Sequence, residues 1–165
     1  MIKYTEAEIT FREVPDEISL SINISNCPYK CKGCHTPYLQ KNIGNELTTE
    51  VLDKLIDENK NEITCITFLG DGNNINEMAK LINHCKNKNL LTCLYTGSTD
   101  IDNIVNICGK GLCYIKIGQY IQEKGGLDSA NTNQKFYKIN YCTDTNGKEY
   151  VIYNDLTYKF ISTVQ

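Results

Sequence analysis

The sequence predicts an α/β fold, with one domain over residues 1–165 that forms a partial (β/α) barrel or an open, mostly parallel sheet. Two observations predict it. Apolar segments with strand patterns alternate along the chain with segments of helical periodicity, which is the arrangement of parallel βαβ units. The chain is also 41% hydrophobic over 165 residues. Folding at this length removes roughly 68–70% of the unfolded surface from water, so one core is enough.

In the first half of the chain, two strand patterns flank one helix pattern. Residues 18–25 alternate apolar and polar side chains, which is typical of a strand. Thr48 and Thr49 precede residues 50–59, whose apolar side chains fall on one helical face, so we expect an N-capped amphipathic helix there. Residues 63–69 give the second strand.

The second half continues the alternation and then changes character. We expect helices over residues 75–87 and 100–107 and strands over residues 90–95 and 112–117. Beyond Gly118 the pattern weakens to two short strands, joined by a turn-rich segment; these lie at residues 134–140 and 149–153, with the turn at 143–147.

Three loops directly follow predicted strands and contain the residues best suited to bind ligands. They span residues 27–34, 70–72 and 96–97. In parallel α/β folds, ligand sites gather where the carboxyl ends of the strands meet. We therefore expect these three loops to converge on one pocket.

Composition and charge argue against two classes of partner. The net charge is −3, with acidic and basic residues interspersed, so no basic face for nucleic acid is expected. Residues 1–12 are polar and alternating rather than a signal peptide, and no apolar run is long enough to cross a membrane. The sequence predicts a soluble, cytoplasmic protein.

Cysteine is the unusual component of this composition. The chain has nine cysteines without secretory features, and an odd number cannot be fully paired within one molecule, so a disulfide scaffold is disfavoured. Six lie scattered in apolar or helical segments, where a thiol behaves as a small buried hydrophobic group; these are Cys65, Cys85, Cys93, Cys108, Cys113 and Cys142.

The other three cysteines form a compact motif. Cys27, Cys31 and Cys34 lie within eight residues, on a loop that contains Pro28 and Gly33, so they can surround one inorganic core. Thiolates ligate iron–sulfur clusters, and three ligands for a four-iron cubane leave one iron open. A zinc site, which prefers four protein ligands, and a chance spacing of unrelated cysteines are the alternatives.

This spacing, directly after the first strand pattern, resembles the radical S-adenosylmethionine superfamily. The resemblance implies that Cys27, Cys31 and Cys34 ligate a [4Fe-4S] cluster whose open iron binds S-adenosylmethionine. Reductive cleavage of that molecule would yield a 5'-deoxyadenosyl radical. Lys32, Gly33 and the backbone of Cys34 would lie along the adenosine.

Further motifs are similar to the activating proteins of anaerobic, class III ribonucleoside-triphosphate reductases. They recur in the expected order, as Cys34-His35, Thr67-Phe68-Leu69-Gly70-Asp71-Gly72, Leu94-Tyr95-Thr96-Gly97 and Thr132-Asn133-Gln134. Such proteins install a glycyl radical on the reductase, and the resemblance implies that reductase as partner and flavodoxin or ferredoxin as electron donor. An activase of another glycyl radical enzyme, and a non-catalytic iron–sulfur or zinc protein, are the alternative functions.

One motif departs from this family, in which two consecutive glycines and an acidic residue usually follow the second strand. Here the order is Gly70-Asp71-Gly72. Aspartate tolerates the left-handed region better than most residues, so the turn can still bind the methionine end of the cofactor, by backbone or by the Asp71 carboxylate. Asn133 is the remaining candidate for cofactor binding. Most of the eleven tyrosines, Tyr29 among them, need no role beyond packing.

Overall fold

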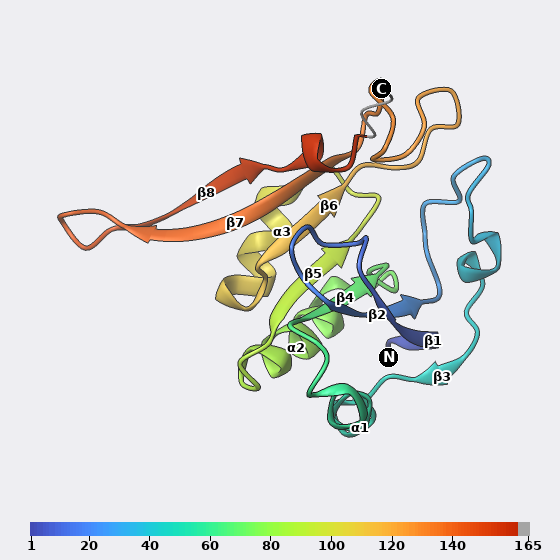
Figure 1. Ribbon diagram of the computed structural model, residues 1–165, viewed down its shortest axis with the longest axis horizontal. Coiled ribbons are helices and arrows are strands. Elements are labelled where there is room, and N and C mark those ends of the chain that lie inside the picture. Colours follow the sequence, from blue (N-terminus) through green and yellow to red (C-terminus); the bar gives the residue numbers. More distant parts are fainter. Residues whose placement is uncertain (162–165) are drawn as a thin grey trace.

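The computed structural model describes residues 1–161 as a mixed eight-stranded sheet with helices packed against it (Figure 1). The strand order across the sheet is β3-β1-β2-β4-β5-β6-β7-β8. The strands are β1 (Lys3–Thr10), β2 (Ser19–Ile24), β3 (Asn45–Glu46), β4 (Cys65–Leu69), β5 (Leu91–Tyr95), β6 (Tyr114–Ile117), β7 (Lys135–Thr143) and β8 (Glu149–Asp155). The sheet is open, with β3 and β8 at its two edges.

The sheet is parallel only in its centre. β2, β4, β5 and β6 pair in parallel, whereas β3, β1, β7 and β8 pair antiparallel with their neighbours. Parallel pairing is therefore confined to the four central strands, and the sheet as a whole is mixed. The reason lies in the connections, because only a long crossover such as a helix can join parallel neighbours. Short segments without a helix join β1 to β2 and β7 to β8.

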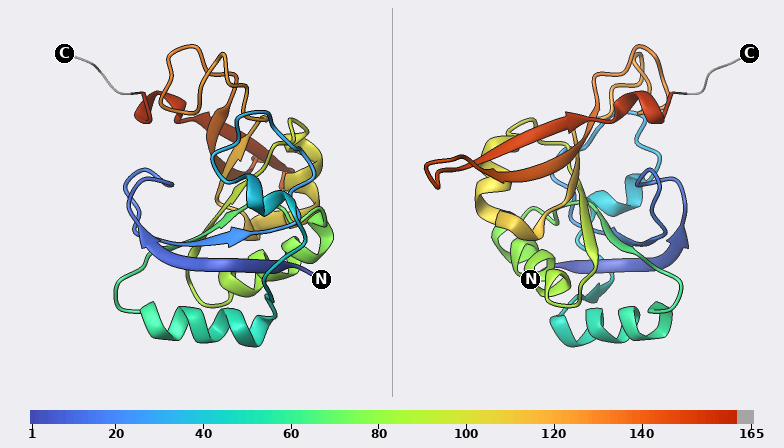
Figure 2. Two further views of the ribbon diagram at one scale, coloured as in Figure 1. Left: turned by 90° about the vertical axis from the view of Figure 1, so that its right-hand side faces the viewer. Right: turned by 60° about the vertical axis from the view of Figure 1, so that its left-hand side comes forward.

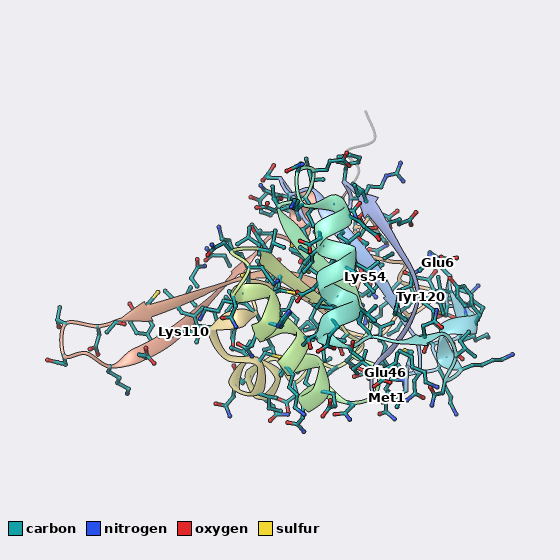
Figure 3. All side chains as sticks on the ribbon, turned by 90° about the horizontal axis from the view of Figure 1, so that it is seen from below. Met1, Glu6, Glu46, Lys54, Lys110 and Tyr120 are labelled. Carbon is teal, nitrogen blue, oxygen red and sulfur yellow. The ribbon has the colours of Figure 1, made fainter. Side chains whose placement is uncertain are left out.

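Three α-helices connect the central strands and lie on one face of the sheet (Figure 3). They are α1 (Thr49–Asn59), α2 (Ile75–Lys86) and α3 (Ile101–Cys108), with short 3₁₀ turns at Pro37–Gln40, Gly109–Gly111 and Thr157–Lys159. Each α-helix begins at a side chain that accepts a backbone N–H of its first turn: Thr48, Asn74 and Asp100. No helix within residues 1–161 is long and apolar enough to cross a membrane.

Both faces of the central strands are covered. The helix side holds the larger cluster, in which Leu20, Ile22 and Phe68 are fully buried. The opposite face holds a smaller cluster around Phe136, with Cys65 and Cys93. Burial raises the pKa of the Cys65 thiol to about 12, and Cys93 shifts in the same direction, so both thiols stay protonated and act as packing groups.

β7 and β8 form a long hairpin that extends away from the rest of the sheet (Figures 1 and 2). Its outer strand is largely exposed, including Tyr150 and Ile152. The loop between β2 and β3, which contains the three clustered cysteines, lies at the opposite side of the molecule in Figure 1. The hairpin and this loop are therefore separate features of the surface.

Candidate functional site

The segment Cys27–Cys34, here called the cysteine loop, leaves the carboxyl end of β2 and turns back on itself. Its start is tied down by the N–H of Asn26, which donates to Lys41 O at 2.9 Å, and by the N–H of Cys27, which donates to Leu39 O at 3.0 Å. Lys30 and Gly33 have positive φ angles of 48° and 73°. These left-handed residues give the loop its tight curvature, which costs glycine little.

The three thiols of the cysteine loop border one pocket of about 270 Å³, called here the cysteine pocket. All three are half-buried and form no disulfide. Within residues 1–161, no three His, Cys, Asp or Glu side chains are arranged to hold a single metal ion. Desolvation raises the pKa of the Cys27 thiol, and the charges of Asp71, Cys31 and Cys34 raise it further. Binding iron at the Cys27 sulfur would therefore release a proton.

Residues at the ends of three neighbouring strands complete the cysteine pocket. Gly70 and Asp71 come from the end of β4, Thr96 and Gly97 from the end of β5, and Lys116 from β6. These positions lie far apart in the sequence, and the parallel pairing of the central strands brings them to one edge. The structure thus brings together the three loops that the sequence singled out.

Asp71 links two of these loops to the cysteine loop. The residue is buried, with 8% of its surface exposed. Oδ2 accepts the hydroxyl protons of Tyr29, at 2.9 Å, and of Thr96, at 2.7 Å, while Oδ1 accepts the N–H of Asn73 at 3.0 Å. Three of the roughly four acceptor positions of the carboxylate are thus filled from within the protein. The carboxylate still borders the pocket, so its contact with a bound methionine stays a prediction.

Tyr29 does more than pack, contrary to the expectation from the sequence. Its ring lies directly on Gly97, where an added Cβ would come within 2.5 Å of the ring atom Cγ. Burial raises the pKa of the phenol, so it keeps its proton at neutral pH and remains a donor to Asp71. The ring borders both the cysteine pocket and a neighbouring hollow of about 490 Å³.

Lys116 is a pocket residue that the sequence reasoning missed. Its ammonium donates to Gly118 O at 3.1 Å and lies 5.6 Å from the centre of the Tyr95 ring. Desolvation lowers the pKa of Lys116 to about 8, although nearby thiolates, Cys31 foremost, act to raise it. A lysine within an otherwise apolar strand, Tyr114–Ile117, is the signal that could have identified it.

Three other predicted cofactor-binding residues lie outside the cysteine pocket. Lys32 and Gly33 are exposed and do not border it, and Gly33 faces the side chain of Gln122 instead. Asn133 lies in the neighbouring hollow, where its Nδ2 donates to Gln119 O at 3.0 Å. Its Oδ1 is buried and has no partner among residues 1–161.

Gly72 is buried in the core and is not among the residues that border the pocket. Its φ is 62°, and a Cβ there would approach Ile2 Cδ1 at 2.7 Å and Ile24 Cγ2 at 3.3 Å. Its need for glycine is thus explained by packing and by a left-handed backbone. Gly70, by contrast, borders the pocket and has a φ of 128°.

Replacing Gly72 by valine should destabilise the fold. We expect the free energy of unfolding to fall by roughly 2–6 kcal/mol, because positive φ and overpacking each cost about 1–3 kcal/mol. Urea denaturation of the cluster-free protein measures this loss. Gly147→Val is the matched control, since Gly147 also has positive φ, at 80°, but nothing within 4 Å of an added Cβ. Equal losses in the two variants would contradict the packing explanation.

A second cleft, of about 470 Å³, lies between α3 and the β7–β8 hairpin. Its polar side chains are largely paired with one another. Lys110 forms an ion pair with Glu149, and the Tyr153 hydroxyl donates to Asp102 at 2.7 Å. Lys110 is labelled beside the hairpin in Figure 3. This cleft lacks the cluster of thiols that distinguishes the cysteine pocket.

Comparison with known proteins agrees with the chemistry of the cysteine pocket. Residues 18–117 match the family described as a 4Fe-4S single cluster domain. No curated protein and no solved structure matches the chain. The residues present fit such a cluster, because three free thiols border one pocket and are its usual ligands. Since the match covers more than half of its residues, the chain belongs to the 4Fe-4S single cluster domain family.

Proposed function

We propose that this protein is a radical S-adenosylmethionine activase that generates a glycyl radical on an anaerobic ribonucleoside-triphosphate reductase. The observation that supports this proposal most directly is the composition of the cysteine pocket. Three half-buried thiols, rather than four, share it with the half-buried ammonium of Lys116 and the carboxylate of Asp71. A pocket for electron transfer alone has no need of a cation and a carboxylate placed where a zwitterionic amino acid can bind.

Cys27, Cys31 and Cys34 are the proposed ligands of the cluster. When bound, a [4Fe-4S] cluster with one open iron supplies the single electron that splits a carbon–sulfur bond of S-adenosylmethionine. The three cysteines of the curved loop border the pocket together with Lys116 and Asp71. These side chains can orient the methionine end of the substrate beside the cluster.

The charges in the pocket match those of a methionine moiety. The Lys116 ammonium can pair with the carboxylate, and the fourth acceptor position of Asp71 can receive the ammonium group, together with carbonyl groups near Gly70. The neighbouring hollow, which Asn133 borders, is then available to the nucleoside. This arrangement makes Asn133 and Asp71 binding residues, and it leaves Lys32 and Gly33 at the periphery.

The proposed substrate is a glycine in a protein. A 5'-deoxyadenosyl radical takes one hydrogen atom from the glycine Cα, which yields 5'-deoxyadenosine and a glycyl radical. A small chain suits this reaction, because the partner's own loop can close the site and exclude water. Flavodoxin or ferredoxin is the proposed electron donor.

Reductive cleavage of S-adenosylmethionine is the direct test. The protein would be reconstituted anaerobically with iron and sulfide, then mixed with dithionite and S-adenosylmethionine. We expect 5'-deoxyadenosine and methionine in equal amounts, and none from protein kept without iron. A reconstituted [4Fe-4S] protein that yields no 5'-deoxyadenosine would instead support a non-catalytic electron carrier.

The partner is identified by a second experiment. Anaerobic incubation with the reductase and with other glycyl radical enzymes should give the electron paramagnetic resonance signal of a glycyl radical only with the cognate enzyme. A signal with a different glycyl radical enzyme, and none with the reductase, would retain the activase function and reassign the partner.

A further inference from the structure

Tyr29 is the side chain that ties the middle of the cysteine loop to the sheet. We infer that Tyr29 anchors this loop in its ligand-binding shape before a cluster is present, and that Asp71, Thr96 and Gly97 form the socket that receives it. The inference rests on the proposed role of Cys27, Cys31 and Cys34 as ligands. It does not depend on the cleavage of S-adenosylmethionine.

The loop needs such an anchor because its backbone is tied down only at its start. Among residues 1–161, the backbone hydrogen bonds of Asn26 and Cys27 reach out to Lys41 and Leu39, whereas the N–H of Cys34 bonds only within the loop, to Cys31 O at 3.2 Å. The intervening residues make no backbone hydrogen bond to another described segment. Side-chain contacts must therefore hold this part of the cysteine loop in one conformation.

The hydroxyl of Tyr29 reaches the ends of two strands. It donates to Asp71 Oδ2 at 2.9 Å and lies 3.1 Å from Thr96 Oγ1, which itself donates to the same carboxylate oxygen at 2.7 Å. Thr96 Oγ1 also accepts the N–H of Ser98 at 3.1 Å. The three side chains thus satisfy one another, and one hydroxyl links the cysteine loop to the loops after β4 and β5.

Packing of the Tyr29 ring fixes the direction of this side chain, in addition to the position of its hydroxyl. A Cβ on Gly97 would lie 2.5, 2.6 and 2.9 Å from the ring atoms Cγ, Cδ2 and Cδ1. Real side chains do not approach so closely, so the seated ring requires glycine at this position. Tyr29 lies between Cys27 and Cys31 in the sequence, so a seated ring also restricts where both neighbouring thiols can point.

Tyr29→Phe tests the anchor, because it keeps the ring and removes the hydroxyl. Two quantities would be measured: hydrogen exchange of peptides covering residues 26–36 in the cluster-free protein, and the rate at which reconstituted protein loses iron to a ferrous chelator. Removing a hydrogen bond to a buried carboxylate should accelerate each roughly tenfold to a hundredfold. Tyr38→Phe is the matched control, since Tyr38 follows the same loop and is 40% exposed; it should behave as wild type.

Two further variants make the test specific. Gly97→Ala should accelerate loop exchange even with the hydroxyl intact, because the ring can no longer be seated. In a double-mutant cycle, the combined effect of Tyr29→Phe and Asp71→Asn should be much smaller than the sum of their separate effects, since both break the same hydrogen bond. Thermal melting of each variant checks that the fold persists.

The outcomes separate the anchor from the ligand assignment. Wild-type exchange and iron loss in Tyr29→Phe, or fully additive effects in the cycle, would overturn the anchor. If the three cysteines were not ligands, the chelator rates of all variants would agree while loop exchange in the cluster-free protein still differed. That pattern would retain the anchor and reject the proposed cluster site.

Discussion

Replacing Cys31 by alanine is expected to abolish the [4Fe-4S] cluster. Two thiolates cannot hold a four-iron cubane against loss of iron, so reconstituted Cys31→Ala protein should contain less than about one iron per chain where wild type contains about four. Cys27→Ala and Cys34→Ala should behave in the same way, because all three thiols border the same pocket. Iron and sulfide analysis after anaerobic reconstitution, with the visible absorption spectrum, measures the effect.

Cys142→Ala is the matched control for this experiment. Cys142 is also a half-buried free thiol, but it lies on β7 in the extended hairpin. Its replacement should leave the iron content unchanged, as should replacement of Cys65 or Cys93, whose thiols are buried and protonated. A full cluster in Cys31→Ala, or its loss in Cys142→Ala, would show that the ligands were assigned wrongly.

Replacing Lys116 by methionine should have opposite effects on ligand binding and on stability. Loss of the ammonium removes a charge-assisted hydrogen bond to the substrate carboxylate, which is worth roughly 1.5–3 kcal/mol, so S-adenosylmethionine should bind about tenfold to a hundredfold more weakly. The cluster-free protein should instead become more stable at pH 7, by about 1–3 kcal/mol, because a desolvated charge is removed from a half-buried site.

The lowered pKa of Lys116 determines how the difference in stability between Lys116→Met and wild type changes with pH. The pKa of Lys116 is about 8 in the folded protein, below its ordinary value of 10.5. Below pH 8 the lysine is charged in both states, and the folded state bears the full desolvation cost. Between pH 8 and 10.5 the unfolded state binds more protons, so the contribution of Lys116 to stability rises with pH. The stability difference between Lys116→Met and wild type should be largest near pH 7 and vanish above about pH 10.5.

Chemical denaturation of the cluster-free proteins at pH 7, 8.5 and 10 measures this difference directly. Comparing the two proteins at each pH cancels the titration of groups that do not interact with Lys116. Titration of S-adenosylmethionine into the reconstituted proteins measures binding. Lys80→Met is a suitable control, because Lys80 is largely exposed on α2 and its ion-pair partner within residues 1–161 is Glu77. Wild-type affinity in Lys116→Met would show that the substrate carboxylate does not lie at this lysine.

The local patterns of the sequence predicted the central elements well. The alternation over residues 18–25 corresponds to β2, and Thr48 caps α1 as expected. These features depend on neighbouring residues, because side-chain periodicity and helix capping are short-range effects. The cysteine motif is equally local, and its assignment to an iron–sulfur cluster protein is confirmed by the family match over residues 18–117. The proposed radical chemistry goes beyond that match and stays a prediction.

What the sequence by itself determined is therefore the set of local elements, the order of the loops and the thiol chemistry. Only the tertiary structure decided which side chains share the pocket. Lys116 and Tyr29 enter it, and Gly72 packs instead against Ile2, since strand pairing and close packing join residues far apart in the chain. The antiparallel flanks of the sheet were decided in the same way, because pairing direction follows from how the chain returns to the sheet, which no single segment records.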